Sequence, residues 1–169
     1  GNYNLIQQTG LTASITTATL SVTGLSAQNK EYDGNATATL TGIINVIPLS
    51  GDAVSVEGTP VGLFNNKNVG TNKPVSITGV TLSGADAGNY NLSAPEGLTA
   101  NITPKPLTVT GATALNKVYD GNAGAVISNA LLTGVVTDDD IALDALTGTF
   151  ASLNVGTGIS VTANLSLTG

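Results

Sequence analysis

The sequence contains no cysteine, histidine, methionine, tryptophan or arginine among its 169 residues. Charged residues make up 9% and aromatic residues 4%, although charged residues are about a quarter of an ordinary soluble domain. The absence of cysteine excludes disulfides, thiolate zinc sites and thiol nucleophiles, and the absence of histidine removes the commonest metal ligand and general base. Much of catalytic chemistry is thereby excluded, and we do not expect an enzyme.

The charge balance is acidic. Five lysines stand against eleven acidic residues, so the formal net charge is -6 and the isoelectric point is near 4.1. Such a chain repels a phosphate backbone and an anionic lipid surface, so we expect no nucleic acid partner and no direct membrane insertion. The longest apolar run, residues 43–47, is also too short and too interrupted to span a bilayer.

What the sequence does contain is an internal repeat with a period of about 87 residues, too long for a solenoid, so each unit is expected to be a small domain. Three motifs recur in the same order. They are Lys-x-Tyr-Asp-Gly at 30–34 and 117–121, Phe-x-x-x-Asn-Val-Gly-Thr at 64–71 and 150–157, and Gly-Asn-Tyr-Asn-Leu at 1–5 and 88–92. The residues singled out as structural motif residues are Tyr32, Asp33, Gly34, Phe64, Tyr90, Tyr119, Asp120, Gly121 and Phe150.

The phase of the repeat predicts three segments. Residues 1–16 are the terminal strands of a preceding repeat, residues 17–103 are a complete repeat, and residues 104–169 are a second repeat that lacks its last strands. An incomplete unit exposes an unpaired edge and an uncovered core. The expected partners are therefore neighbouring repeats of the same chain, with the further hypothesis that residues 1–16 of one copy supply the missing strands of another by strand exchange.

Short stretches of period-two alternation predict β-strands, and no helical periodicity is sustained anywhere. Leu20 alternates with its polar neighbours, as do Val56 and Ile102 further along. Strands of four to eight residues separated by Gly- and Asp-rich turns indicate tandem small antiparallel β-sandwich domains. The fold class is therefore all-β.

Two features suggest an immunoglobulin-like sandwich and a well-packed core. Residues 86–90 have the Asp-x-Gly-x-Tyr form of a tyrosine corner, in which the tyrosine hydroxyl bonds to nearby backbone. The Asp-Gly pairs that follow Tyr32 and Tyr119 are suited to a tight turn with positive φ. All six aromatic residues occupy positions matched between repeats, including Tyr3 with Tyr90, so we expect them in the core rather than in a ligand site.

The one acidic cluster consists of Asp138, Asp139, Asp140 and Asp144. A glycosidase would need two carboxylates with one pKa raised by burial, whereas adjacent acids in a loop are solvated. Carboxylates are also the ligands that calcium prefers, but the spacing is not that of an EF-hand, and the cluster does not recur in the other repeat. The sequence favours a hydrated acidic turn over a weak calcium site, and no other cofactor is expected.

The three motifs, taken in order and at these distances, closely resemble the YDG-type repeat found in tandem in large bacterial surface proteins, including filamentous-haemagglutinin-like adhesins exported by two-partner secretion. The resemblance covers nearly the whole chain and implies an extracellular stalk or fibre module, at the cell surface or secreted, that supports cell adhesion or biofilm formation. It supplies no catalytic residues. The alternatives are a direct glycan- or protein-binding module, for which the divergent residues 43–49 and 129–140 are candidates, and a self-assembling fibre subunit.

Overall fold

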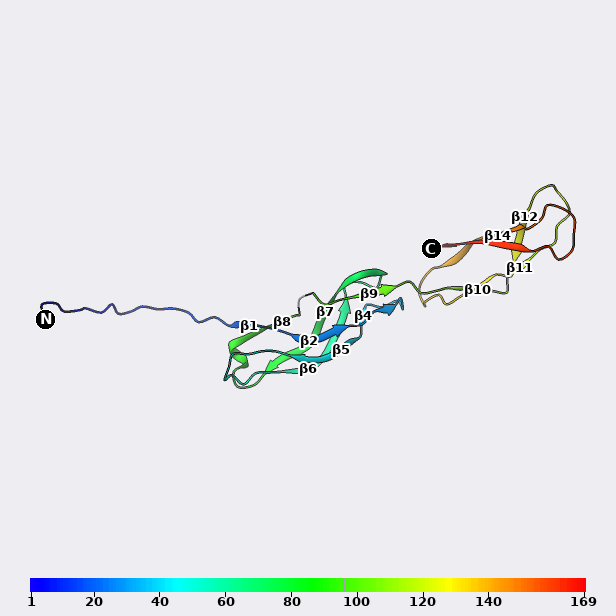
Figure 1. The fold of residues 1–169 in the computed structure, drawn as a ribbon. Coiled ribbons are helices and arrows are strands. Elements are labelled where there is room, and N and C mark those ends of the chain that lie inside the picture. Colours follow the sequence, from blue (N-terminus) through cyan, green and yellow to red (C-terminus); the bar gives the residue numbers. More distant parts are fainter. Residues whose placement is uncertain (96) are drawn as a thin grey trace. The chain divides into compact units, whose positions relative to one another are not determined.

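The computed structural model describes residues 1–95 and 97–169, and its fold is all-β, as the sequence predicts (Figure 1). The chain forms two compact units. The first unit comprises Gly1–Lys30, Ala36–Asn66 and Thr71–Asn101. The second comprises Glu31–Asn35, Lys67–Gly70 and Ile102–Gly169, so it includes two short segments that the sequence period places in the first repeat.

The largest sheet has the strand order β3-β9-β7-β6-β4. Its strands are β3 (Lys30–Glu31), β4 (Thr37–Ala38), β6 (Ser55–Phe64), β7 (Gly70–Ser83) and β9 (Thr99–Thr103). The long strands β6 and β7 are antiparallel, with Ser55 opposite Ser83 and Phe64 opposite Val75. Their register shifts between Gly58 and Val61, which marks a β-bulge.

Two further strand pairs complete the first unit. β2 (Thr23–Ala27) pairs with β5 (Leu40–Asn45) in antiparallel fashion. β1 (Ala18–Ser21) pairs with β8 (Tyr90–Ser93), which follows the short 3-10 turn η1 (Ala87–Asn89). β1 and β8 are parallel, unlike the antiparallel pairs above, and the long stretch between them supplies the crossover that parallel strands require.

The core of the first unit follows from the alternation of its strands. Leu20, Val46 and Tyr90 are buried together, and partly buried aliphatic side chains pack against them: Val54, Val56, Leu82 and Leu92. On β9, Ala100 and Ile102 are buried on either side of Asn101, and Ile102 is only 1% exposed. Burying an aliphatic side chain of this size stabilises the fold by about 1.5–3 kcal/mol.

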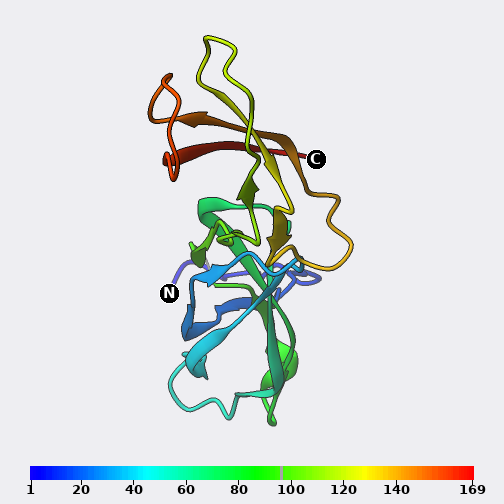
Figure 2. The same ribbon diagram turned by 90° about the vertical axis from the view of Figure 1, so that its right-hand side faces the viewer.

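The second unit repeats this plan with fewer strands. β10 (Thr108–Thr110) pairs with β13 (Leu131–Thr133). A four-stranded sheet has the order β11-β12-β14-β15, formed by β11 (Thr113–Ala114), β12 (Gly124–Ser128), β14 (Ala142–Phe150) and β15 (Val161–Thr168). β14 and β15, orange to red in Figure 2, form its longest pair, with Ala142 opposite Thr168 and Phe150 opposite Val161. Ala125 and Ile127 on β12 are its buried side chains.

Residues 1–17 are assigned to no strand, and their side chains are exposed. The prediction that all aromatic residues lie in the core is correct for Phe64 and Tyr90, which are buried, but it is wrong for Tyr3 and Tyr119. Tyr3 is completely exposed and Tyr119 is 64% exposed. Each lacks the packing that its counterpart in the other repeat receives. Among the described residues, no helix is long and apolar enough to cross a membrane.

Candidate functional site

The Asp-Gly turn after each motif tyrosine has the predicted geometry. In the first repeat the Asp33 carboxylate accepts the backbone N–H of Asn35 at 3.1 Å. In the second, Asp120 accepts the N–H of Asn122 at the same distance. The following glycines have φ of 83° and 80°, a region that side chains disfavour. The aspartate and the glycine therefore stabilise the turn in both repeats.

The motif lysine closes the same loop over the motif phenylalanine. Lys30 Nζ donates to the Thr37 carbonyl at 3.1 Å and lies 5.9 Å from the centroid of the Phe64 ring. Lys117 Nζ lies 5.9 Å from the centroid of the Phe150 ring. A cation over an aromatic face is attracted by the ring quadrupole. The lysine of the first motif and the phenylalanine of the second motif therefore contact each other in both units.

Lys117 makes further contacts in its loop. Its Nζ donates to the carbonyls of Asn122 at 2.8 Å and Gly124 at 3.1 Å, and it pairs with Asp120 at 2.7 Å. The Lys117 ammonium is the main cause of the lowered pKa of Asp120, followed by the backbone N–H of Asn122. The charged groups of the motif therefore bond to one another and to the backbone of the same loop.

Tyr90, the tyrosine of the Gly-Asn-Tyr-Asn-Leu motif, ties β8 to the loop that precedes β6. Its hydroxyl donates to Asp52 Oδ2 at 2.6 Å and accepts the backbone N–H of Leu49 at 3.1 Å. The hydrogen bond to Asp52 raises the pKa of Tyr90, and burial adds to the shift. The tyrosine-corner prediction is therefore wrong about the partner, because the hydroxyl bonds a loop about 40 residues away rather than the local turn.

The turn before Tyr90 is fixed to the same loop. Asp86 Oδ2 accepts the N–H of Ala53 at 2.8 Å, and the N–H of Asp86 donates to the Ala53 carbonyl at 3.3 Å. Gly84 has φ of 114°, and a side chain there would clash with the same carbonyl. The role of the loop around Asp52 was not recognised from the sequence, although Asp52 and Asp139 occupy matched positions, which was the available signal.

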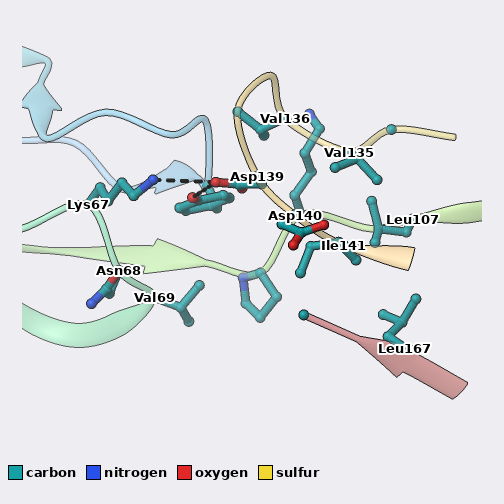
Figure 3. Close-up of a pocket in the computed structure, with 15 residues that line it drawn as sticks. Lys67, Asn68, Val69, Leu107, Val135, Val136, Asp139, Asp140, Ile141 and Leu167 are labelled. Atoms are coloured by element: carbon teal, nitrogen blue, oxygen red, sulfur yellow. Dashed lines mark hydrogen bonds and ion pairs between the residues drawn. The ribbon is translucent and has the colours of Figure 1, made fainter. Parts of the chain in front are cut away.

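The structure does not bring the acidic cluster together. Asp139 Oδ1 accepts the Tyr32 hydroxyl at 3.0 Å and pairs with Lys67 at 3.3 Å, as the dashed lines in Figure 3 mark. Asp138 and Asp140 are exposed, and Asp144 contacts Ser166 at 3.5 Å. The described residues contain no group of three or more possible ligands that could hold a metal ion, so the calcium candidate has no geometric support in that part of the chain.

Lys67, which the sequence did not single out, completes a small polar cluster in the second unit. Its Nζ lies 5.9 Å from the Tyr32 ring centroid. The pKa of Lys67 is raised, first by the hydrogen bond with Tyr32 and then by that with Asp139. Tyr32 is therefore held through both its hydroxyl and its ring.

Beside this cluster the second unit contains a cavity of about 540 Å³, which we call the first hollow (Figure 3). Three of the aliphatic side chains that line it are Leu107 and Ile141, which directly precede β10 and β14, and Leu167 of β15. Asp139 and Lys67 form its polar side. Asp140 and Lys105 also line it, so the edge of this cavity carries two carboxylates and two ammonium groups.

A second cavity in the same unit, of about 770 Å³, is called here the second hollow. It lies against the edge of β15 and the Lys-x-Tyr-Asp-Gly loop, with Tyr119, Phe150 and Val161 among its lining residues. The strand order places β15 at the edge of its sheet, so one side of its backbone pairs with β14 and the other does not pair within the described sheet.

Comparison with protein families identifies the unit. The model of the YDG domain family matches residues 16–97 and residues 103–169. The chain belongs to the YDG domain family. No curated protein sequence and no solved structure matches it.

Both regions that match the family model contain the motif contacts described above. The name-giving Tyr-Asp-Gly triplet of this YDG chain forms an aspartate-capped turn with a glycine at positive φ in each repeat. The lysine two residues before the tyrosine covers the phenylalanine ring. In this YDG chain these shared residues make contacts within the fold, and the two hollows are candidates for binding among the described residues.

Proposed function

We propose that this chain is a structural stalk or fibre module of a bacterial cell-surface or secreted adhesin, that it works outside the cell, and that it is not an enzyme. The observation that carries the proposal is the repeated use of the same residues for the same contacts. Lys30 and Lys117 each lie 5.9 Å from a motif phenylalanine ring, and Asp33 and Asp120 each cap the same turn. Residues needed in every copy for folding are what a repeated spacer requires.

Composition supports the same proposal. The chain has no cysteine or methionine, which are the side chains most prone to oxidation outside the cell. It also has no histidine, and the acids of its one cluster do not converge among the described residues. The order of its motifs resembles that of repeats in filamentous-haemagglutinin-like adhesins, which is the basis for proposing a role in adhesion or biofilm formation.

Replacement of residues 1–169 by an unrelated β-sandwich array of equal length tests the stalk role in the bacterium that produces the protein. A spacer is defined by its length, so the replacement should leave adhesion unchanged, whereas deletion of the same residues should reduce it. Antibodies against the chain should label intact cells. Loss of adhesion after equal-length replacement, together with binding of the isolated chain to a host glycan or protein, would contradict the stalk role and support a binding module.

A further inference from the structure

The second unit of the fold contains two segments that come from the first repeat. They are Glu31–Asn35, which carries the Tyr-Asp-Gly triplet, and Lys67–Gly70, which lies in the Phe-x-x-x-Asn-Val-Gly-Thr motif. Both segments fall inside the first region that matches the YDG family model, residues 16–97, whereas most of this unit belongs to the second region, residues 103–169. The boundary between the two units therefore does not coincide with the boundary between the two repeats.

One turn of the second repeat contacts the first of these segments. The Asp139 N–H donates to the Val136 carbonyl at 3.1 Å, which closes a turn over residues 136–139. At one end of the turn, Asp139 Oδ1 accepts the Tyr32 hydroxyl at 3.0 Å. At the other end, Val136 lies against Gly34, where a Cβ would be 2.8 Å from Val136 Cγ1. The turn therefore contacts both the tyrosine and the glycine of the Tyr-Asp-Gly triplet.

Lys67 joins the same contact from the second segment. Its Nζ lies 3.3 Å from Asp139 Oδ1 and 5.9 Å from the centroid of the Tyr32 ring, and Figure 3 marks the ion pair with a dashed line. The Asp139 side chain is 19% exposed, whereas that of Lys67 is 49% exposed. A carboxylate that is largely shielded from water needs such donors to stay charged. Asp139 is therefore bonded by both segments of the first repeat.

The ion pair depends on a residue that differs between the repeats. The position of Lys67 is occupied by Leu153 in the second repeat, although the motif residues on either side match. A leucine offers neither a cation nor a hydrogen-bond donor to an aspartate. The tyrosine of the triplet is present in both repeats, as Tyr32 and Tyr119. The hydrogen-bonding part of the surface is thus shared between the repeats, and the charged part is variable.

A second ion pair links the same two parts of the sequence. Lys105 Nζ lies 3.3 Å from Glu31 Oε1, and Glu31 directly precedes Tyr32. The two side chains are 34% and 50% exposed, so this pair contributes little by itself. Lys105 stands between Pro104 and Pro106, whose fixed φ angles reduce the conformations open to the unfolded chain. The stiff connection therefore lowers the entropy lost when the turn binds the loop.

We propose that the Tyr-Asp-Gly loop of one YDG repeat is the binding surface for the repeat that follows it, and that the turn at residues 136–139 is the segment that binds. Tyr32 supplies the hydrogen bond, and Gly34 leaves the space that Val136 occupies. Lys67 sets the strength of the contact, because a repeat with leucine at that position forms the tyrosine bond without the ion pair. This proposal does not rest on the stalk function or on where the protein works.

The consequence of this contact is that the two repeats do not fold independently. Both segments continue directly into strands of the largest sheet, since β3 ends at Glu31 and β7 begins at Gly70. Unfolding of those strands releases Tyr32 and Lys67 from Asp139 and so loosens the second unit. Contacts between neighbouring repeats of this kind make the stability of a tandem array cooperative.

Amide hydrogen exchange of the 169-residue chain, followed residue by residue by NMR, tests the coupling. Tyr32→Phe removes only the hydroxyl that Asp139 accepts, so exchange in β12 and β14 of the second unit should become about tenfold faster. Tyr119→Phe removes the matched hydroxyl from a side chain that is 64% exposed, and it should leave exchange in these strands unchanged. Exchange that changes only in the first unit, or that changes equally in both variants, would overturn the proposal.

A double-mutant cycle separates the hydrogen bond from a general loss of stability. Tyr32→Phe should have less than about a twofold effect on exchange in a chain that already carries Asp139→Ala, because the acceptor is then absent. In a chain that carries Asp140→Ala, which removes the exposed neighbouring carboxylate, Tyr32→Phe should keep its full effect. Independent effects of Tyr32→Phe and Asp139→Ala would show that the two side chains do not act as a pair and would contradict the proposal.

Substitution of Lys67 tests what sets the strength of the contact. Lys67→Leu gives the first repeat the residue of the second, and it should speed exchange in β12 and β14 by about two- to fivefold. The difference from the unchanged chain should shrink in about 1 M salt, because salt screens partly exposed charges. Lys67→Arg keeps the charge and should keep the protection. No effect of Lys67→Leu at low salt, or an equal effect of the leucine and arginine variants, would contradict the role given to Lys67.

Discussion

The hydroxyl of Tyr90 lies 2.6 Å from a carboxylate oxygen of Asp52, and this hydrogen bond joins two segments 38 residues apart in the sequence. Tyr90 is itself 7% exposed, so its ring contributes to the core while its hydroxyl is bonded at the rim. The same hydroxyl accepts the N–H of Leu49. One side chain thereby fixes β8 against the loop that precedes β6.

The first prediction concerns the pH dependence of this contact. The pKa of Tyr90 is raised by the hydrogen bond to Asp52 and by burial, so the protonated tyrosine stabilises the fold. This contribution is fully present below the ordinary tyrosine pKa of about 10 and is lost as the pH rises through the higher folded value. Tyr90→Phe should lower the denaturation midpoint at neutral pH, and the difference from the unchanged chain should shrink above pH 10. Urea unfolding from pH 7 to 11 measures both, and a difference independent of pH would contradict it.

The sequence predicted those features that depend on neighbouring residues. The Asp-Gly turns at Gly34 and Gly121 and the alternation that buries Ile102 follow from local conformational preference and strand periodicity. The partners of Tyr90 could not be predicted, because a hydroxyl about 40 residues from its acceptor is placed by the register of the whole sheet.

The burial of Tyr119 is a second feature that the sequence does not predict correctly. Matched positions in the repeats predict matched burial, but Tyr119 is 64% exposed whereas Tyr32 is held by Asp139 and Lys67. Burial depends on which segments cover a side chain, and both partners of Tyr32 are distant from it in the sequence. The acidic cluster illustrates the same point, because adjacency in sequence did not bring its carboxylates to one place.

The second prediction concerns Asp120. The Lys117 ammonium is the main cause of its lowered pKa, so Lys117→Met should raise the pKa of Asp120 towards its ordinary value of 3.8. In the unchanged chain this pair stabilises the fold above that value, and the contribution is lost as the pH falls through the lower folded value. NMR titration of the side-chain carboxyl measures the shift. Lys105→Met, which removes the partner of Glu31 instead, is the control and should leave Asp120 unchanged.

The third prediction compares the two motif glycines. Both have positive φ, so alanine at either site carries backbone strain, and Gly121→Ala should lower the free energy of unfolding by about 1–2 kcal/mol. Gly121 has open space around its Cβ position, whereas a Cβ at Gly34 would lie 2.8 Å from Val136 Cγ1. Gly34→Ala should therefore cost more than Gly121→Ala in urea unfolding. Equal losses would show that the contact with Val136 is absent in solution.

The last prediction compares Ile102 with Ile15, which occupy the same position of the repeat. Ile102 is 1% exposed, so Ile102→Ala should lower the free energy of unfolding by about 2–5 kcal/mol. Ile15 is fully exposed, so Ile15→Ala should change it by less than about 0.5 kcal/mol in dilute solution. Urea unfolding of the two variants measures both changes, and equal losses at the two positions would contradict the burial of Ile102.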